Sequence, residues 1–594
     1  MHTETTEKKA PLLQFKHVEV GTPQLVITAD IPDFVRQAYG AAEAGDMDRV
    51  RLLLAQCDTD TLAAHLTTQA YHVQVVFLLG LIYARIEAWE SAETCFTQVL
   101  QGVPHAMVYH ELNRICMLTG RLKQARDYRQ QAYALSSDNP ILCCNHATDL
   151  FRLGQMQEGI KVFWQAANAA PHNARIGSRY LNALSYLAEH CQENLKAAHR
   201  RWALAHTSPA LAAPAPDHDF TGSRSLRVGY LLGDLCRRTV GYGIDALLEG
   251  HDRYRFESFA YTDGRILDEV CPLVQPCFKA CHDIAELDDQ NVAQRIKDDR
   301  IDILVAVGGH SFLSRLRVLA YQPAPIQLEY GAFCPTPMDQ INYRLEEWFE
   351  PSGDQAEVAV PPLLCFKPDS VFPGVGPLPA LANDCVTFGC FNTSYKMTAH
   401  MLSVWARILD RVENSRLLLK FRGGYDTQQR RACLARFEQW GIAPQRIEMH
   451  GWQRYTEHLE LLTQADIALD TYPNNGRTTL LEALWMGVPF VTRTDPNSDL
   501  FMSRRGQALL NTVELACLAC SSDEQYIEAA VLLSQKRDGL SLIRSSLRQR
   551  LTIPGGLCDA RVFALRMEKA YRRMWEHECR TRQNHTTSPS DITA

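Results

Sequence analysis

The stretch ADIALDTYPNNGRTTLLEALWMGVPFVTR (465–493) contains a strand, a loop, a helix and a second strand in one short segment. ADIALDT (465–471) and VPFVTR (488–493) are apolar runs of strand length, and the Leu- and Ala-rich residues between them have helical composition. Two strands joined by a helix in this way form the repeating unit of a parallel α/β sheet. The stretch therefore predicts an α/β domain in this part of the chain.

The loop of this stretch, residues 474–479, has two interpretations. In the first, Thr478 or Thr479 caps the helix and Glu482 is a favourable acid in its first turn. In the second, the N–H groups at the helix start and the Arg477 guanidinium hold an anion. Glu482 would then accept hydrogen bonds from sugar hydroxyls, which suits a nucleoside diphosphate. Only the second interpretation also accounts for the amides and the glycine before the threonines, but the residues alone leave both open.

The same alternation of strands and helices extends over most of residues 226–493. A Pro-rich passage at 361–380 divides the apolar runs into two sets, which predicts two parallel-sheet domains with a cleft between them. The predicted strands of the first set are LRVGYLL (226–232), FESFAYT (256–262), IDILVAVGG (301–309) and PIQLEYGAF (325–333). Those of the second set are CVTFGCFN (385–392), SRLLLKF (415–421), RIEMHG (446–451), ADIALDT and VPFVTR.

The residues before position 207 have helical periodicity and contain a repeat. Ala92, Ala125 and Gly159 are 33 and 34 residues apart, and Pro104 and Pro171 each follow the second helix of a predicted pair. Small residues at this spacing, where two helices cross, resemble tetratricopeptide repeats. A generic helical bundle is the alternative interpretation. A repeat array predicts a groove that binds a polypeptide.

The composition limits the classes of function. The 594 residues are 46% hydrophobic and 22% charged, as in a soluble globular protein of roughly three or four domains. The net charge of −7 argues against nucleic acid as the main partner. No apolar run has the length of a signal peptide or a bilayer span, so we expect a cytoplasmic protein without a membrane span.

The cysteines do not predict a metal site. Nineteen cysteines in a chain without a signal peptide indicate reduced, mostly buried thiols. Cys517 and Cys520 form a lone CxxC pair. A second group lacks a zinc-like spacing and consists of Cys271, Cys277, Cys281 and His282.

These patterns predict the domain organisation. A Pro-, Gly- and Ser-containing linker separates the helical part from the α/β part. The final helical segment, 560–578, is expected to pack back on the helical array. The predicted parts are a flexible N-terminus (1–29), a helical domain (30–206), the linker (207–225), a first lobe (226–380), a second lobe with the final helix (381–578) and a disordered tail (579–594).

Three places in the second lobe have polar residues where a predicted strand ends. CFNTSYKMT (390–398) carries Lys396, HGWQRYTEHLELL (450–462) carries His458, and the third place is the loop at 474–479. In an open α/β sheet, ligands collect at the carboxyl ends of the strands. These three places are therefore the candidate ligand-binding loops.

The sequence resembles bacterial relatives of the O-linked N-acetylglucosamine transferases, family GT41. The matching stretches span about residues 72–575 and include LRVGYLLGDL (226–235), FGCFNTSYKMTAHMLSVWARIL (388–409) and ADIALDTYPNNGRTTLLEALWMGVPFVT. The resemblance implies an α + α/β fold, in which an all-helical tetratricopeptide-like array precedes a GT-B fold of two Rossmann-like α/β domains.

The resemblance also implies an activity. The expected enzyme is an inverting, metal-independent UDP-sugar:protein glycosyltransferase that needs no cofactor. It would move N-acetylglucosamine or another hexose from the UDP-sugar to a protein side chain, with Ser or Thr as the expected acceptor. The acceptor protein or peptide would bind in the groove of the helical repeats.

Individual residues take implied roles by matching the motifs of this family. Lys396 matches the lysine that faces the diphosphate, and Asp234 an aspartate considered as a proton acceptor. His310 matches a histidine that faces the cleft from the first lobe. The residues expected to bind the nucleotide are Asn392, Thr393, Gln453, Tyr455, His458, Gly476, Arg477, Thr478, Thr479 and Glu482.

The sequence departs from the family pattern on both sides of the expected cleft. Arg238 and Arg477 replace histidines, and residues 393–396 lack the glutamine amide that the family motif has near the nucleotide. EYGAFCPTPMD (329–339) lacks the glycine-rich character of the acceptor loop. Two alternatives therefore stay open. One is an adhesin-type protein N-glucosyltransferase that acts on Asn, and the other is an inactive repeat scaffold that binds nucleotide or a partner protein.

Overall fold

A computed structural model describes most of the chain. The described residues are 15–16, 24–25, 33–43, 46–55, 69–102, 104–152, 154–190, 192–208, 211, 218–233, 242–262, 274–285, 287–311, 314–332, 334–345, 364–368, 371–421, 424, 426–495, 498 and 500–587. The chain divides into two compact units, residues 1–148 with 168–170, and residues 149–167 with 171–594.

The first unit consists mainly of helices that pack in consecutive pairs: α1 with α2, α4 with α5, and α6 with α7. Two short antiparallel strands, β1 (Phe15–Lys16) and β2 (Gln24–Leu25), precede them. The helices are α1 (Asp33–Glu43), α2 (Met47–Ala55), α4 (Gln69–Arg85), α5 (Trp89–Gly102), α6 (Ala106–Leu118), α7 (Leu122–Leu135) and most of α8 (Pro140–Arg152).

Small residues let these helices approach closely. A Cβ atom on Gly80 of α4 would lie only 2.6 Å from the Phe96 ring of α5. In the next pair, the buried Asn113 side chain donates a hydrogen bond of 2.6 Å to the carbonyl of Ala125. Ala125 is one of the positions that the repeat spacing selects. The repeat therefore corresponds to pairs of helices held together at small or polar crossing residues.

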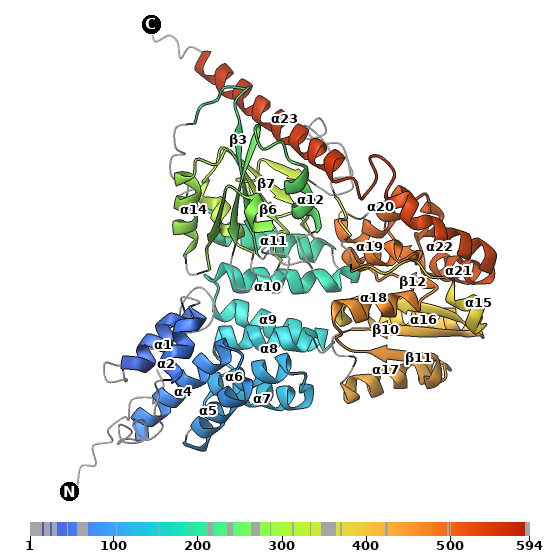
Figure 1. The fold of residues 1–594 in the computed structure, drawn as a ribbon, viewed down its shortest axis with the longest axis horizontal. Helices are drawn as coiled ribbons and strands as arrows, with labels where there is room; N and C mark the ends of the chain where they lie inside the picture. The colour runs from blue at the N-terminus through green and yellow to red at the C-terminus, as the bar shows by residue number, and fades with distance from the viewer. Residues whose placement is uncertain are drawn as a thin grey trace. The chain divides into compact units, whose positions relative to one another are not determined.

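The second unit contains two six-stranded sheets in which all strands run parallel. Helices flank each sheet (Figure 1). The first sheet has the order β5-β4-β3-β6-β7-β8 and consists of β3 (Leu226–Leu232), β4 (Phe256–Thr262), β5 (Ala280–Asp283), β6 (Ile303–Val307), β7 (Ile326–Tyr330) and β8 (Tyr343–Leu345). The second has the order β11-β10-β9-β12-β13-β14 and consists of β9 (Val386–Cys390), β10 (Ser415–Lys420), β11 (Ile447–His450), β12 (Ile467–Leu469), β13 (Phe490–Arg493) and β14 (Ala519–Cys520).

In the two six-stranded sheets, all the strands predicted from the sequence are present, whereas β5, β8 and β14 were not predicted. These three strands are short, and β5 and β8 are only partly buried. They lack the continuous apolar run by which a central parallel strand is recognised. Both sheets have the order 3-2-1-4-5-6 of a doubly wound α/β domain.

Helices connect the strands of both lobes. The α-helices are α12 (Tyr242–Gly250), α14 (Asp289–Asp298), α15 (Pro379–Asn383), α16 (Ala399–Arg411), α17 (Thr427–Gln439), α18 (Tyr455–Thr463), α19 (Thr478–Trp485), α20 (Arg505–Thr512), α21 (Asp523–Gln535), α22 (Arg537–Leu551) and α23 (Ala560–Thr587). The 3-10 helices of these lobes are η4 (Gln275–Cys277), η5 (Leu316–Tyr321), η7 (Ser394–Lys396), η8 (Pro444–Arg446), η9 (Phe501–Ser503) and η10 (Ala516–Leu518).

The helices of the second unit that precede the linker are most of α9 (Met156–Ala169), α10 (Ala174–Leu184), η1 (Ser185–His190) and α11 (Gln192–His206). Buried residues of α10 and α11 pack directly on the first sheet. Trp202 of α11 packs with core residues of the first sheet, and its indole N–H donates to the carbonyl of Ala174 at 3.0 Å. A Cβ atom on Gly177 would lie 2.7 Å from this indole, so α10 and α11 cross closely.

The final helix corrects an expectation from the sequence. Instead of packing on the helical array, α23 packs on α12 and on the first sheet (Figure 1). Its apolar stripe, with Met567, Tyr571 and Trp575 fully buried, fits the core of that lobe. The helix also continues to Thr587, through most of the segment predicted to be disordered, while residues 588–594 lie outside the described residues.

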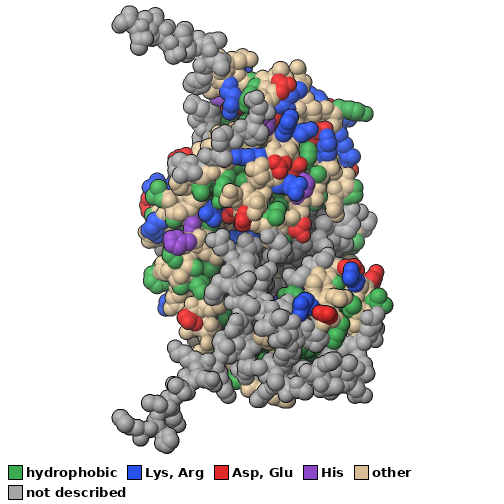
Figure 2. All heavy atoms as spheres, turned by 90° about the vertical axis from the view of Figure 1, so that its left-hand side faces the viewer, with side chains coloured by type: hydrophobic (Ala, Val, Ile, Leu, Met, Phe, Trp, Pro, Cys, Tyr) green, Lys and Arg blue, Asp and Glu red, His purple; other side chains and the backbone are tan. Residues whose placement is uncertain are grey.

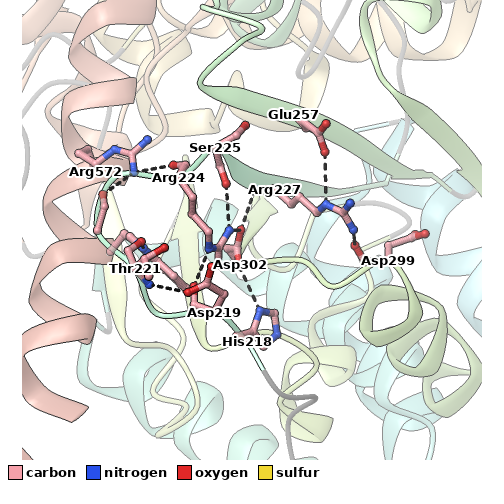
Figure 3. A network of polar contacts seen from close by, with 12 residues as sticks. His218, Asp219, Thr221, Arg224, Ser225, Arg227, Glu257, Asp299, Asp302 and Arg572 are labelled. Carbon is pink, nitrogen blue, oxygen red and sulfur yellow. Dashed lines mark hydrogen bonds and ion pairs between the residues drawn. The ribbon is translucent and has the colours of Figure 1, made fainter. Parts of the chain in front are cut away.

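A polar network fastens the last part of the linker and the start of β3 to the first lobe (Figure 3). The buried Asp302 carboxylate accepts two hydrogen bonds from the Arg224 guanidinium, at 2.6 and 2.8 Å, and one from the Arg227 N–H at 2.8 Å. His218 Nδ1 lies 3.1 Å from the same carboxylate. Arg572 of α23 donates to the carbonyl of Arg224. The network therefore joins the start of the first lobe to its last helix.

The surface charges and the apolar character of the helices also bear on the expectations from composition. On the face shown in Figure 2, acidic and basic side chains of the described residues are interspersed. Within the described part of the chain, no helix combines the length and the apolar character needed to cross a membrane.

Candidate functional site

The loops after β9 and β12 meet at one edge of the second sheet. β9 and β12 are adjacent parallel strands, and β10 and β13 continue the sheet in opposite directions from them. Ligands of doubly wound sheets bind at such a switch point, outside the carboxyl ends of the strands. The sheet order therefore brings residues 391–398 and 470–479 to the position where a ligand is expected.

Asp470 directly follows β12 and holds the second of these loops in place. Its fully buried carboxylate accepts hydrogen bonds from the N–H groups of Gly476 (2.7 Å) and Thr471 (2.8 Å). The Thr492 hydroxyl of β13 donates a third, at 2.6 Å. We did not predict a role for Asp470 from the sequence, although an acid directly after a buried strand is a readable signal.

Asn475 connects this loop to its neighbours. Its side-chain N–H groups donate to the carbonyls of Thr471 (2.8 Å) and Arg493 (3.1 Å), and its side-chain oxygen accepts from the Gly506 N–H (3.2 Å). Its backbone carbonyl accepts a hydrogen bond of 2.8 Å from Lys396 Nζ. One asparagine thus joins the loops after β12 and β13, the start of α20 and the loop after β9.

Lys396, at the end of η7, is the cation at the centre of this group. Burial is the main cause that lowers the pKa of Lys396, and Arg505 lowers it further, whereas Asp470 raises it. Burial likewise raises the pKa of Asp470, against the effect of its three hydrogen-bond donors and of Lys396. The ammonium and the carboxylate therefore interact through the protein interior, where charges are poorly screened.

Glu482 of α19 organises the residues predicted to face the nucleotide. Its buried carboxylate accepts a hydrogen bond from the Tyr455 hydroxyl (3.0 Å) and lies 3.2 Å from His458 Nε2. Both partners belong to α18. Among the described residues, neither His458 Nδ1 nor Gln453 Oε1 has a hydrogen-bond partner, although both atoms are buried. A polar group of a ligand bound here would give both atoms a hydrogen-bond partner.

The structure corrects the capping interpretation of the threonines. Helix α19 begins at Thr478, so the N-cap is Arg477, whose side chain makes no capping hydrogen bond. The Thr479 hydroxyl instead donates to the side-chain oxygen of Asn392 at 3.2 Å. The hydroxyl thus bonds to the loop after β9 rather than to the backbone of its own helix.

The remaining predicted binding residues lie on the same loops. A Cβ atom on Gly476 would come within 2.8 Å of Leu480 and 3.2 Å of the Asn392 amide, so this position has no room for a side chain. Thr393 is exposed at the start of η7, and Arg477 is half-exposed at the start of α19. The predicted nucleotide residues thus come from the loops after β9, β11 and β12 and from α18 and α19. Their roles in binding stay predictions.

His310 lies in a separate, enclosed environment. Its Nδ1 is 2.9 Å from the Ser178 hydroxyl of α10, and its ring packs edge-on against Trp202 and His199 of α11. Burial lowers the pKa of His310 well below its ordinary value, with smaller effects of His199 and His206. Its described contacts are with α10 and α11, and none of them belongs to the group around Lys396. The structure therefore does not bring His310 into that group.

The acceptor side is only partly described. Asp234 and Arg238 lie outside the described residues. The buried Glu329 of β7 accepts hydrogen bonds from the N–H (3.2 Å) and hydroxyl (2.8 Å) of Thr336, in the unusual loop that follows this strand. Burial raises the pKa of Glu329, against the effect of these donors. Within the described ranges, no group of three His, Cys, Asp or Glu side chains is placed to hold a metal ion.

Tyr395 links the loop after β9 to the helical part of the second unit. Its ring lies 4.6 Å from that of Tyr186 in η1 and 6.1 Å from that of Phe151 in α8. Tyr395 is the residue before Lys396, and both belong to η7. Aromatic packing against η1 and α8 therefore supports the turn that presents the lysine.

Comparisons with known proteins agree with these features. The family model described as glycosyl transferase family 41 matches residues 184–341 and 378–567. The chain is 32% identical over 426 residues to the "Probable UDP-N-acetylglucosamine--peptide N-acetylglucosaminyltransferase SPINDLY" of Solanum lycopersicum, and 31% identical over 427 residues to its namesake in Arabidopsis thaliana. These matches cover 69% of this chain but only 45% and 46% of the relatives, so the chain spans less than half of their length.

Among solved structures, the chain is similar to a mutant of the O-GlcNAc transferase of Thermobaculum terrenum. The TM-score is 0.79 and the sequence identity 28%, over 87% of this chain and 100% of the other. With the helical region and the two parallel sheets, this similarity confirms the predicted α + α/β fold, a helical array followed by a GT-B fold.

Proposed function

This chain belongs to glycosyl transferase family 41, and on that basis we propose that it transfers a sugar from a UDP-sugar to a protein side chain. N-acetylglucosamine is the first candidate for the sugar, because the similar plant proteins are named as UDP-N-acetylglucosamine–peptide transferases. The acceptor is a Ser or Thr side chain of a polypeptide that binds to the helical pairs of the first unit.

The observation that carries this proposal is the arrangement at the switch point of the second sheet. Lys396 is anchored on the carbonyl of Asn475, directly before the start of α19. A helix start presents free N–H groups and partial positive charge, which together with a lysine favour a diphosphate. One turn into α19, Glu482 accepts a hydrogen bond from Tyr455 and lies beside His458, both of α18, and this group of polar side chains suits the ribose and the base.

Lys396 acts on the leaving group in this proposal. The acceptor hydroxyl oxygen forms a bond to the anomeric carbon while the bond from that carbon to the β-phosphate oxygen breaks. The electron pair leaves with UDP, and a fixed cation stabilises the negative charge that develops there. This cation and the helix start supply the positive charge without a metal ion.

A single displacement inverts the anomeric configuration. The proton of the acceptor hydroxyl passes to Asp234, or through a water molecule to a phosphate oxygen of the donor. Asp234 has this role by its match to the family motif. The positions that differ from the family, Arg238 and the loop at 329–339, lie on the same acceptor side.

Peptide-dependent release of UDP tests the proposal. The purified chain is incubated with UDP-N-acetylglucosamine and candidate peptides, UDP is measured directly, and the modified residue is mapped by mass spectrometry. We expect UDP release that depends on the peptide and an N-acetylhexosamine on Ser or Thr. Modification of Asn would establish the N-glucosyltransferase alternative, and binding of UDP without any transfer would establish the inactive scaffold.

A further inference from the structure

Arg505 is a buried arginine at the start of α20, with only 4% of its surface exposed. The next residue, Gly506, donates its N–H to the Asn475 side chain at 3.2 Å. The carbonyl of the same Asn475 accepts the hydrogen bond from Lys396 Nζ. Arg505 thus directly precedes the residue that bonds to Asn475, the asparagine that anchors Lys396, and it lies on a different element of the lobe.

The segment that leads to Arg505 is held firmly against the loop after β12. The Asn475 N–H donates to the carbonyl of Met502 at 3.0 Å. Leu500 and Met502 are fully buried in a cluster with Leu195 of α11 and Cys334 of the first lobe. The start of α20 is therefore fixed next to the candidate diphosphate position by hydrogen bonds and by apolar packing.

Arg505 also interacts electrostatically with two groups of the site. Its charge contributes to the lowered pKa of Lys396, after burial as the main cause. It opposes the rise that burial produces in the pKa of Tyr186. The two cations, Lys396 and Arg505, therefore repel each other inside the protein, where charge is poorly screened. An anion bound between them would convert this repulsion into attraction.

We infer that Arg505 is a second cation of the donor site and binds the diphosphate of the UDP-sugar together with Lys396. This inference rests on the proposed function. A guanidinium presents parallel N–H donors that match two phosphate oxygens, whereas a lysine acts as a point charge. Arg505 would therefore orient the diphosphate and, with Lys396, stabilise the charge on departing UDP.

Binding of UDP and of uridine by the full chain tests this inference. Calorimetry of the unaltered protein comes first, because a chain that does not bind UDP would overturn the proposed function itself. In Arg505→Met, we expect the affinity for UDP to fall about 10-fold or more, as for loss of a hydrogen bond to a charged group. The affinity for uridine, which lacks phosphate, should stay unchanged. Arg505→Lys keeps the charge without the fork and should lie between the two proteins.

A second buried arginine of the same lobe provides the matched control. Arg544 of α22 is 2% exposed and donates to the carbonyls of Gly376, Ala465 and Thr463. Arg544→Met should lower the thermal midpoint while the folded protein binds UDP as before. If Arg505→Met does not fold, the comparison of Arg505→Lys with the unaltered protein decides, because only a phosphate-binding role lowers UDP affinity and leaves uridine affinity unchanged.

The pH dependence of UDP binding tests whether the charge of Arg505 acts on Lys396. Arg505 helps to lower the pKa of Lys396, so its removal should move the alkaline loss of UDP affinity to higher pH. UDP affinity unchanged in Arg505→Met, or equal losses for UDP and uridine, would overturn the inference.

Discussion

At the scale of single residues, the contacts of Lys396 show what a motif does and does not reveal. The match of FNTSYK to the family motif identified the lysine. Its fixed position depends on the carbonyl of Asn475, 79 residues further along the chain, and on the charge of Asp470. No local pattern reveals such partners, because they come together only when β9 and β12 are adjacent in the sheet.

Replacing Lys396 tests its role at this scale. Lys396→Ala should lower the turnover by about 100-fold or more, the usual cost of removing one group that stabilises developing charge. The thermal midpoint should change little, because the variant loses a single hydrogen bond to a carbonyl. Turnover is measured as peptide-dependent UDP release, and folding by thermal unfolding.

A surface lysine is the control for this prediction. Lys279 is half-exposed and pairs with Glu257 on the first lobe, so Lys279→Ala should keep full turnover. If Lys396→Ala releases UDP at the rate of the unaltered chain, Lys396 has no part in the reaction.

At the scale of elements, the contacts made by helix starts and short turns can be predicted only in part from their own sequences. From the sequence, Thr478 or Thr479 could cap α19. In the structure the helix begins at Thr478, and the Thr479 hydroxyl bonds to Asn392. The turn η7 is likewise supported from outside, because Tyr395 packs on Tyr186 of η1. In both cases, a neighbouring element decides what the side chain does.

The packing of Tyr395 predicts an effect on turnover. Tyr395→Ala removes the ring that supports η7, so Lys396 should lose its fixed position. Because small displacements of a reacting group are costly, we expect kcat to fall by about 10-fold. Tyr254→Ala, which removes a tyrosine that is 93% exposed, is the control and should leave kcat unchanged. An unaltered kcat in Tyr395→Ala would mean that η7 holds Lys396 without this contact.

The Asp302 network predicts a pH-dependent stability. Burial alone would raise the pKa of Asp302, but hydrogen bonds from Arg224, His218 and the Arg227 N–H outweigh burial and lower it. A carboxyl whose pKa is lowered in the folded state stabilises the protein above its ordinary pKa near 4, and this contribution disappears as the pH falls through the folded value. The stabilisation should therefore be complete at neutral pH and disappear in strong acid.

Asp302→Asn tests this prediction. At pH 7 the variant should lose about 1.5–3 kcal/mol of unfolding free energy, the range for hydrogen bonds to a charged group. The difference from the unaltered protein should shrink as denaturant unfolding is repeated toward pH 3. Asp384→Asn, at a side chain 84% exposed, is the control. A difference that is constant with pH would show that the charge of Asp302 is not involved.

At the scale of the whole second unit, the last helix, α23, packs on the first lobe although it follows the second lobe in the sequence. After the second sheet is complete, α23 packs on α12 and on the core of the first lobe. Trp575 stacks on Phe220 and donates its indole N–H to the carbonyl of Thr221 at 3.1 Å. The first lobe is therefore built from both ends of the α/β region.

Removing the Trp575 side chain of α23 should destabilise the first lobe. Trp575→Ala removes a fully buried indole and its hydrogen bond, at an expected cost of about 3–5 kcal/mol in unfolding free energy. Thermal or denaturant unfolding measures the loss. Leu565→Ala, on the same helix at 53% exposure, should cost little. Similar effects of both substitutions would contradict the packing of α23 on this lobe.

The sequence by itself determined the class of elements and their order. The period of the apolar residues separates helices from buried strands, because a helix buries one stripe and a central parallel strand buries both faces. That was enough for the nine predicted strands and the helix pairs. It was not enough for β5, β8 and β14, because such short edge strands lack a continuous apolar run.

Only the tertiary structure decided which residues act together. Adjacency of β9 and β12 brings Lys396 to Asn475, and a contact between α18 and α19 brings His458 to Glu482. The tertiary structure also packs His310 against α10 and α11, and places the start of α20, with Arg505, beside Asn475. The physical reason is that sequence periodicity records which face of an element is buried. The partner on that face depends on strand order and on helix packing, which join residues far apart in the chain.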